Sequence, residues 1–189
     1  MQDVFILEET TVIAPHDSYL LSYPHLVAFF ASKTSLTPGD VVCGAHMVYG
    51  WMPTILDLYP RASNLDFAAA AKLLTDIKNS EKATDNELSK LAALVNNSLV
   101  GASKLLHFLL PNTFPIWDSK VYAFVFEKKA NQNRISDVSA FRKYQTILNQ
   151  LQGDPRFKNY RRSMNNKIGY EVSPIRALEL VMYLNAPTV

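Results

Sequence analysis

The 189-residue sequence contains a single cysteine, Cys43, so no disulfide bond can form within the chain. A lone thiol is typical of proteins from a reducing compartment. The first residues, MQDVFILEETTV, lack the basic segment and the long apolar run of a secretion signal. The longest uncharged stretch, residues 41–56, is 16 residues long and includes His46, which makes it too short for a membrane-spanning helix. These absences predict a cytoplasmic protein with no membrane partner.

Histidines are also few, at positions 16, 25, 46 and 107, and they lack the spacing and the acidic neighbours of a metal site. The sequence contains no glycine-rich phosphate loop, no Ser-His-Asp order and no zinc-deaminase pattern. We therefore predict no metal ion and no cofactor.

Hydrophobic residues make up 48% of the sequence and charged residues 19%, a balance that excludes a disordered chain. There is neither an internal repeat nor an alternation of strands and helices. Helix-start signals recur instead, at Pro24, Thr37–Asp40, Ser63–Asp66, Thr84–Glu87, Asp118, Asp137, Asp154–Pro155 and Ser173. We predict one mainly α domain, residues 1–189, built as a compact orthogonal bundle of about nine helices. Residues 4–13 are β-rich and predict a short N-terminal β-hairpin or an extended arm.

The sequence is organised around residues 98–128. Residues 99–110 are apolar almost all round and predict a buried helix, with one polar stripe formed by Ser103, Lys104 and His107. Pro111 ends this helix, and Asp118 stands where the N-cap of a second helix belongs. The turn between them is long enough, at roughly 20 Å when extended, to bring Asp118 back to Lys104.

Two interpretations of Asp118 remain open at this point. An aspartate at an N-cap satisfies free backbone amides and interacts favourably with the helix dipole, which is a sufficient structural reason for its presence. The same carboxylate, fixed at a helix start between aromatic residues, can also face a cleft and stabilise positive charge there.

The segment FPIWDSKV, residues 114–121, resembles the proline–hydrophobic–aspartate segment of the helix-hairpin-helix DNA glycosylases, of the MutY, endonuclease III and 8-oxoguanine glycosylase type. The resemblance covers about residues 98–128, in which Pro115 matches the family proline and residues 100–106 match the hairpin exit. It implies that Asp118 is the catalytic carboxylate. Lys104 lies one residue beyond the lysine of the bifunctional members, and Gly101 stands alone where the family hairpin usually has two glycines.

The resemblance implies an all-α DNA-binding hydrolase of DNA repair, which cleaves the N-glycosidic bond of a damaged or modified base. Asp118 would stabilise the positive charge of the transition state. Lys104 would be a nucleophile only if burial lowers its pKa, and its one-residue offset predicts that no Schiff base is trapped. Two alternatives stay open: a non-enzymatic nucleic-acid-binding protein, and a helical protein-interaction module in which Asp118 is only a cap.

Residues 46–60 are rich in large side chains, which indicates either core packing or the wall of a pocket that could stack an extruded base. The candidate pocket residues are His46, Tyr49, Trp51, His107 and Trp117.

Charge is unevenly distributed along the sequence. Residues 1–127 contain 8 basic and 13 acidic residues, a net charge of −5, whereas residues 128–189 contain 11 basic and 4 acidic residues, a net charge of +7. No acidic residue lies between Pro155 and Tyr170, where the basic residues are Arg156, Lys158, Arg161, Arg162 and Lys167. Such a run forms either a solvated helix face or a phosphate-binding surface. It makes nucleic acid, DNA first, the predicted partner, while the oligomeric state is undetermined by the sequence.

Overall fold

The structure is a computed structural model that describes residues 1–14, 16–52 and 54–187. These residues form eleven helices and no β-strand. The helices are α1 (Val4–Thr10), α2 (Ser18–Ala31), α3 (Pro38–Trp51), α4 (Phe67–Ser80), α5 (Asp85–Leu94), α6 (Leu99–Leu109), α7 (Ser119–Phe126), α8 (Gln132–Ile135), α9 (Val138–Gln152), α10 (Phe157–Ile168) and α11 (Pro174–Leu184). The prediction of a mainly α fold is confirmed.

Side-chain caps explain where most of these helices begin. Each cap accepts a hydrogen bond from a backbone N–H of the first turn, which has no partner within the helix. Six of the predicted start residues act in this way: Thr37, Asp66, Thr84, Asp118, Asp137 and Ser173. Helices α3 and α5 also have complete capping boxes.

The prediction of an N-terminal β-hairpin was wrong, because residues 4–10 form helix α1. The carboxylate of Asp3 accepts a hydrogen bond from Phe5 N at 2.9 Å and caps this helix. Packing against α10 and α11 then buries Val4, Phe5 and Glu8, so tertiary contacts overrule the β-propensity of the segment. Helix α1 and the four-residue helix α8 were not predicted, and together they account for eleven helices rather than nine.

Pro24 was expected to begin a helix but lies inside α2, which starts at Ser18 behind the cap Asp17. Proline has no N–H group to bond the carbonyl of the residue four positions earlier, which here is Leu20. The hydroxyl of Tyr170 donates to that carbonyl oxygen at 2.7 Å. The helix therefore tolerates Pro24, because a side chain from the loop after α10 replaces the missing hydrogen bond.

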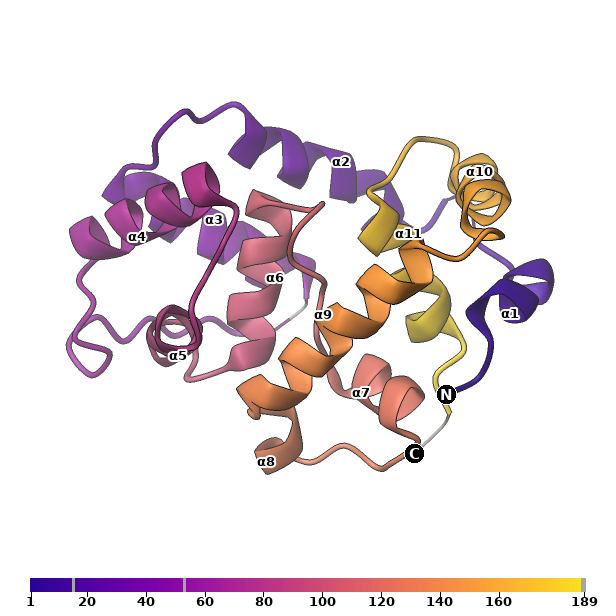
Figure 1. Ribbon diagram of the computed structural model, residues 1–189. Helices are drawn as coiled ribbons and strands as arrows, with labels where there is room; N and C mark the ends of the chain where they lie inside the picture. Colours follow the sequence, from indigo (N-terminus) through magenta and orange to yellow (C-terminus); the bar gives the residue numbers. More distant parts are fainter. Residues whose placement is uncertain (15, 53, 188–189) are drawn as a thin grey trace.

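The helices form two groups that meet along α9 and α11 (Figure 1). In the first group α2, α3 and α6 pack on one another, α4 packs on α3, and α5 packs on α6. In the second group α11 contacts α1, α7, α9 and α10, while α8 packs on α9. One continuous hydrophobic cluster passes through both groups, and its largest fully buried side chain is that of Trp117. No helix in the described part of the chain has the length and apolar character needed to cross a membrane.

Candidate functional site

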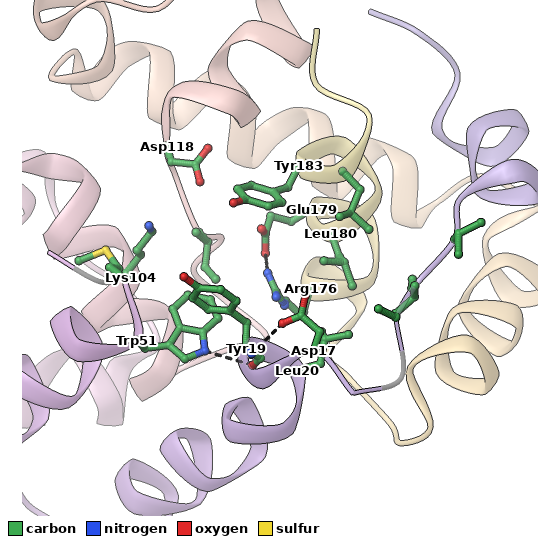
Figure 2. A pocket seen from close by; sticks show the side chains of 16 residues that line it. Asp17, Tyr19, Leu20, Trp51, Lys104, Asp118, Arg176, Glu179, Leu180 and Tyr183 are labelled. Carbon is green, nitrogen blue, oxygen red and sulfur yellow. Dashed lines mark hydrogen bonds and ion pairs between the residues drawn. The ribbon is translucent and has the colours of Figure 1, made fainter. Parts of the chain in front are cut away.

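A cavity of about 260 Å³ lies where the two groups of helices meet. Its walls come from residues 12–14, the start of α2, the end of α3, the middle of α6, the residue that caps α7, and α11. Five charged residues line it: Asp17, Lys104, Asp118, Arg176 and Glu179 (Figure 2). The two candidate catalytic residues of the sequence analysis therefore share one cavity.

Lys104 projects from α6 into this cavity and is largely buried. Burial lowers the pKa of its ammonium group, although the nearby carboxylates of Asp118 and Glu179 act in the opposite direction. Among the described residues, no hydrogen bond or ion pair to Lys104 Nζ is recorded. An amine with a lowered pKa and no fixed partner is available as a nucleophile at a lower pH than an ordinary lysine.

Asp118 caps α7, and its Oδ1 accepts a hydrogen bond from Val121 N at 2.9 Å. One oxygen thus fixes the carboxylate at the helix start. Figure 2 shows the carboxylate directed into the cavity and the amine of Lys104 pointing toward it from the same side of the cavity. The structural and the functional interpretations of Asp118 are consequently compatible, because a single side chain can do both.

Hydrogen bonds from α6 hold the turn that carries Asp118. The hydroxyl of Ser103 accepts a hydrogen bond from Trp117 N at 3.1 Å and donates to Val100 O at 2.8 Å. Ser103 and Trp117 immediately precede Lys104 and Asp118, so this one bond sets the relative position of the two cavity residues. The indole N–H of Trp117 donates to Ile135 O at 2.8 Å and fixes the same turn from its other side.

His107 holds the turn as well and lies in the core rather than at the cavity. Its Nδ1 is 2.7 Å from Phe114 O, and its Nε2 is 2.8 Å from the hydroxyl of Tyr23. A carbonyl oxygen can only accept, so Nδ1 carries the proton and Nε2 accepts from Tyr23. Burial, with a contribution from the positive charge of Arg176, lowers the pKa of His107 to about 3. The ring is therefore a neutral structural link.

Aromatic side chains cover another side of the cavity. Trp51 lines it, and its indole N–H donates to Tyr19 O at 3.1 Å. The rings of Tyr19 and Trp51 meet edge to face with centroids 5.5 Å apart, and Tyr183 lines the opposite part of the wall. Tyr19 and Tyr183 were not among the predicted pocket residues, because nothing in their local sequence separates them from core tyrosines.

The other predicted pocket residues lie elsewhere. Trp117 is fully buried in the core, and His46 is exposed on α3 and does not line the cavity. Tyr49 is buried beside α6 and lines a separate hollow that Lys104 also borders. Its hydroxyl occupies the space beside Gly101, where an added Cβ would lie only 2.0 Å away. Residue 53 of the same aromatic stretch lies outside the described residues.

Arg176 and Glu179 form an ion pair that the sequence analysis missed. Both lie on α11, and Arg176 Nη1 is 2.6 Å from Glu179 Oε2, with side chains 5% and 1% exposed. The signal that could have revealed them is an Arg and a Glu three residues apart within the otherwise apolar helix PIRALELVMYL. Such a spacing is common on solvated helix faces, and only the packing of α11 shows that the pair is buried.

The basic residues of the 155–170 region separate into two sets. Lys158, Arg161 and Arg162 line one open groove of about 880 Å³, together with two asparagines of α10. Arg156 instead forms ion pairs with Asp3 and Asp154, at 2.9 and 2.8 Å.

Lys167 pairs with Glu8 of α1 at 2.6 Å, so it too is neutralised. The open groove is distinct from the cavity. One hydrogen bond connects their walls: the hydroxyl of Tyr170, a residue of the groove, donates to the carbonyl of Leu20, a residue of the cavity.

Within the described ranges, no three His, Cys, Asp or Glu side chains gather in a way that could hold a metal ion. Comparison of the chain with protein-family models, curated proteins and solved structures found no match. The functional interpretation therefore depends on the cavity and the groove.

Proposed function

We propose that the protein is a DNA N-glycosylase that removes a damaged or modified base. The observation that supports this most directly is that Lys104 and Asp118, from different helices, face one small cavity walled by aromatic side chains. An amine nucleophile and a carboxylate are the two groups needed to break an N-glycosidic bond through a covalent intermediate. Lys104 would be a nucleophile only if burial lowers its pKa, and burial does lower it.

In the proposed reaction, the unprotonated Nζ of Lys104 attacks C1′ of the deoxyribose. A C1′–N bond to the lysine forms while the bond between C1′ and the base breaks, and the base leaves with the electron pair and takes a proton from water. The carboxylate of Asp118 stabilises the positive charge that develops on the sugar. Nζ then loses a proton, its lone pair expels the ring oxygen, which is protonated, and an iminium linkage remains.

The surroundings of the two groups suit an extruded nucleotide. At about 260 Å³ the cavity is smaller than the roughly 300–1,000 Å³ of sites for drug-sized ligands, which favours a single base. Trp51, Tyr19 and Tyr183 offer ring faces and edges for stacking, as enzymes that act on extruded bases require. The groove formed by Lys158, Arg161 and Arg162 would contact phosphates outside the cavity.

Borohydride trapping tests the proposal. The one-residue offset of Lys104 predicts no trapping, whereas its lowered pKa and its place in the cavity with Asp118 favour trapping. Borohydride reduces an iminium to a stable amine, so on the present proposal the wild-type protein should cross-link to duplex DNA that contains an abasic site or a damaged base. Lys104→Gln should abolish the cross-link. Lys90→Gln, which changes an exposed lysine of α5, is the matched control and should cross-link like the wild type.

Two outcomes would contradict the covalent step: no cross-link with the wild type, or an undiminished cross-link with Lys104→Gln. DNA binding through the α10 groove without any base release would favour the alternative, a non-enzymatic nucleic-acid-binding protein.

A further inference from the structure

The ion pair between Arg176 and Glu179 is buried at the cavity wall, yet it is poorly explained as a stabilising element. Removing two charges from water costs several kcal/mol each, and replacement of such a pair by apolar residues is often neutral or favourable. Burial raises the pKa of Glu179, although Arg176 opposes the shift, which shows how unfavourable the surroundings are for its charge. Because stability does not explain this buried pair, we consider whether it binds a ligand in the cavity that it borders.

Both members of the pair have hydrogen-bonding capacity left. A guanidinium group carries five N–H donors, and a carboxylate has two oxygens that accept. Among the described residues, the only hydrogen bond recorded between or to these two side-chain groups joins Nη1 to Oε2. The buried side-chain atoms without a partner in the described part of the chain are Tyr144 Oη and Arg161 Nε. The remaining nitrogens of Arg176 and Oε1 of Glu179 are therefore not sealed in the core, and the accessible space they border is the cavity.

The pair is also held in one orientation. The guanidinium of Arg176 lies over the ring of Tyr23 at 5.1 Å and near the ring of Trp51 at 5.7 Å. Its backbone N–H donates to the cap residue Ser173 at 3.0 Å. In Figure 2 the pair lies across the cavity from Lys104 and Asp118, with Trp51 and Tyr19 on a third side. A base whose sugar lies at Lys104 and Asp118 would thus present its far edge to Arg176 and Glu179.

We propose that Arg176 and Glu179 recognise the base in this cavity, and that the base is of the guanine type. This proposal rests on the proposed function. A guanine-type edge presents a carbonyl acceptor, O6, beside two donors, N1–H and N2–H. Arg176 would donate to O6, a preferred partner of arginine, and Glu179 would accept from the two N–H groups. Adenine and cytosine place a ring-nitrogen acceptor where N1–H of guanine lies, and thymine places O2 where the N2–H of guanine lies. Each of these acceptors repels the carboxylate.

Nucleoside binding tests this recognition without requiring catalysis. Trp51 lines the cavity, so its fluorescence should report an occupant, and Trp51→Phe should remove the signal. We expect guanosine to bind most tightly and inosine, which lacks the 2-amino group, more weakly. Adenosine, cytidine and uridine should bind about ten- to a hundredfold more weakly than guanosine, the discrimination typical of one bidentate contact.

Glu179→Gln is the decisive variant, because it keeps the shape of the side chain and replaces one acceptor oxygen by a donor group. The amide NH2 of a glutamine repels the N2–H2 donor of guanosine, which inosine lacks, so guanosine should bind about tenfold more weakly and lose its advantage over inosine. The double variant Arg176→Met/Glu179→Met replaces the pair by apolar side chains of similar length. It should fold and bind all five nucleosides alike, which keeps the test valid if Glu179→Gln is unstable.

Failure of this proposal can be separated from failure of the proposed function. Equal binding of all nucleosides by the wild type, or a preference for another base, would overturn guanine recognition. An unchanged preference in Glu179→Gln and in the double variant would do the same. If the protein releases an adenine or pyrimidine lesion and Asp118→Asn loses this activity, the proposed glycosylase function is supported and the guanine assignment is refuted. A guanosine preference that both variants lose would support it even if no base is released.

Discussion

Replacement of Ser103 by alanine tests how the structure fixes the distance between the two cavity residues. The change removes the oxygen that accepts from Trp117 N at 3.1 Å, and both residues are fully buried. The Trp117 N–H is then left without a partner, which costs about 1–3 kcal/mol. For a domain of this size, 1 kcal/mol shifts the melting temperature by about 2–4 °C. Ser103→Ala should therefore lower the melting temperature by about 2–12 °C.

Ser89→Ala is the matched control for this experiment. The hydroxyl of Ser89 also donates to a backbone carbonyl of its own helix, Asp85 O at 2.8 Å, but it is exposed and, among the described residues, forms no hydrogen bond to another helix. Its replacement should change the free energy of unfolding by less than about 0.5 kcal/mol. Ser103→Ala should also slow trapping by Lys104, because the turn that carries Asp118 is released. Equal melting temperatures for the two variants would refute the argument that this bond holds the site.

Three further predictions concern pH and salt. Folded His107 has a pKa of about 3 and the unfolded residue one near 6.5, so between these values only the unfolded chain takes up the proton and stability rises with pH. Urea unfolding should show that the wild type loses about 2 kcal/mol more than His107→Gln between pH 7 and pH 5; equal losses would contradict the buried neutral ring. The rate of trapping should rise with pH and reach its midpoint at the pKa of Lys104, which lies below 10.5. Asp118→Asn should lower this midpoint further, because the charge of Asp118 raises the pKa of Lys104. A midpoint at 10.5 would refute the lowered pKa. The double variant Arg161→Ala/Arg162→Ala should weaken DNA binding and reduce the slope of log K against log salt by about 2. Arg156→Ala should change this slope less, because Arg156 is paired with Asp3 and Asp154. Equal slopes for the double variant and Arg156→Ala would argue against DNA binding in the open groove.

Local sequence signals predicted much of the fold. Capping residues such as Thr37, Asp66 and Thr84 act within four residues, so the sequence alone identifies the helix starts they define. The prediction failed for residues 4–10, where α1 is stabilised by burial against α10 and α11. It failed again at Pro24, whose place inside α2 depends on a hydrogen bond from Tyr170, about 150 residues away in the sequence. Contacts at such separations leave no periodic pattern to detect.

The candidate site likewise contains residues that local sequence signals could reveal and residues that they could not. Lys104 and Asp118 could be singled out from a short stretch, since they follow a buried helix and a proline-bounded turn, and the structure brings them to one cavity. Their partners Arg176 and Glu179 could not, because a charged pair three residues apart has the same spacing on a solvated helix face. Burial, which distinguishes the two cases, depends on how α11 packs against the other helices.

The central claim is that Asp118 contributes its negative charge to catalysis and not only its cap to α7. Asp118→Asn keeps the oxygen that accepts from Val121 N and removes the charge, and Asp66→Asn makes the same change at the exposed cap of α4. Asparagine caps a helix about as well as aspartate, so both variants should melt like the wild type. Base release from a panel of lesion-bearing duplexes should fall by about a hundredfold or more in Asp118→Asn and stay unchanged in Asp66→Asn. Equal base release by Asp118→Asn and the wild type, or none by the wild type on any duplex, would contradict the claim.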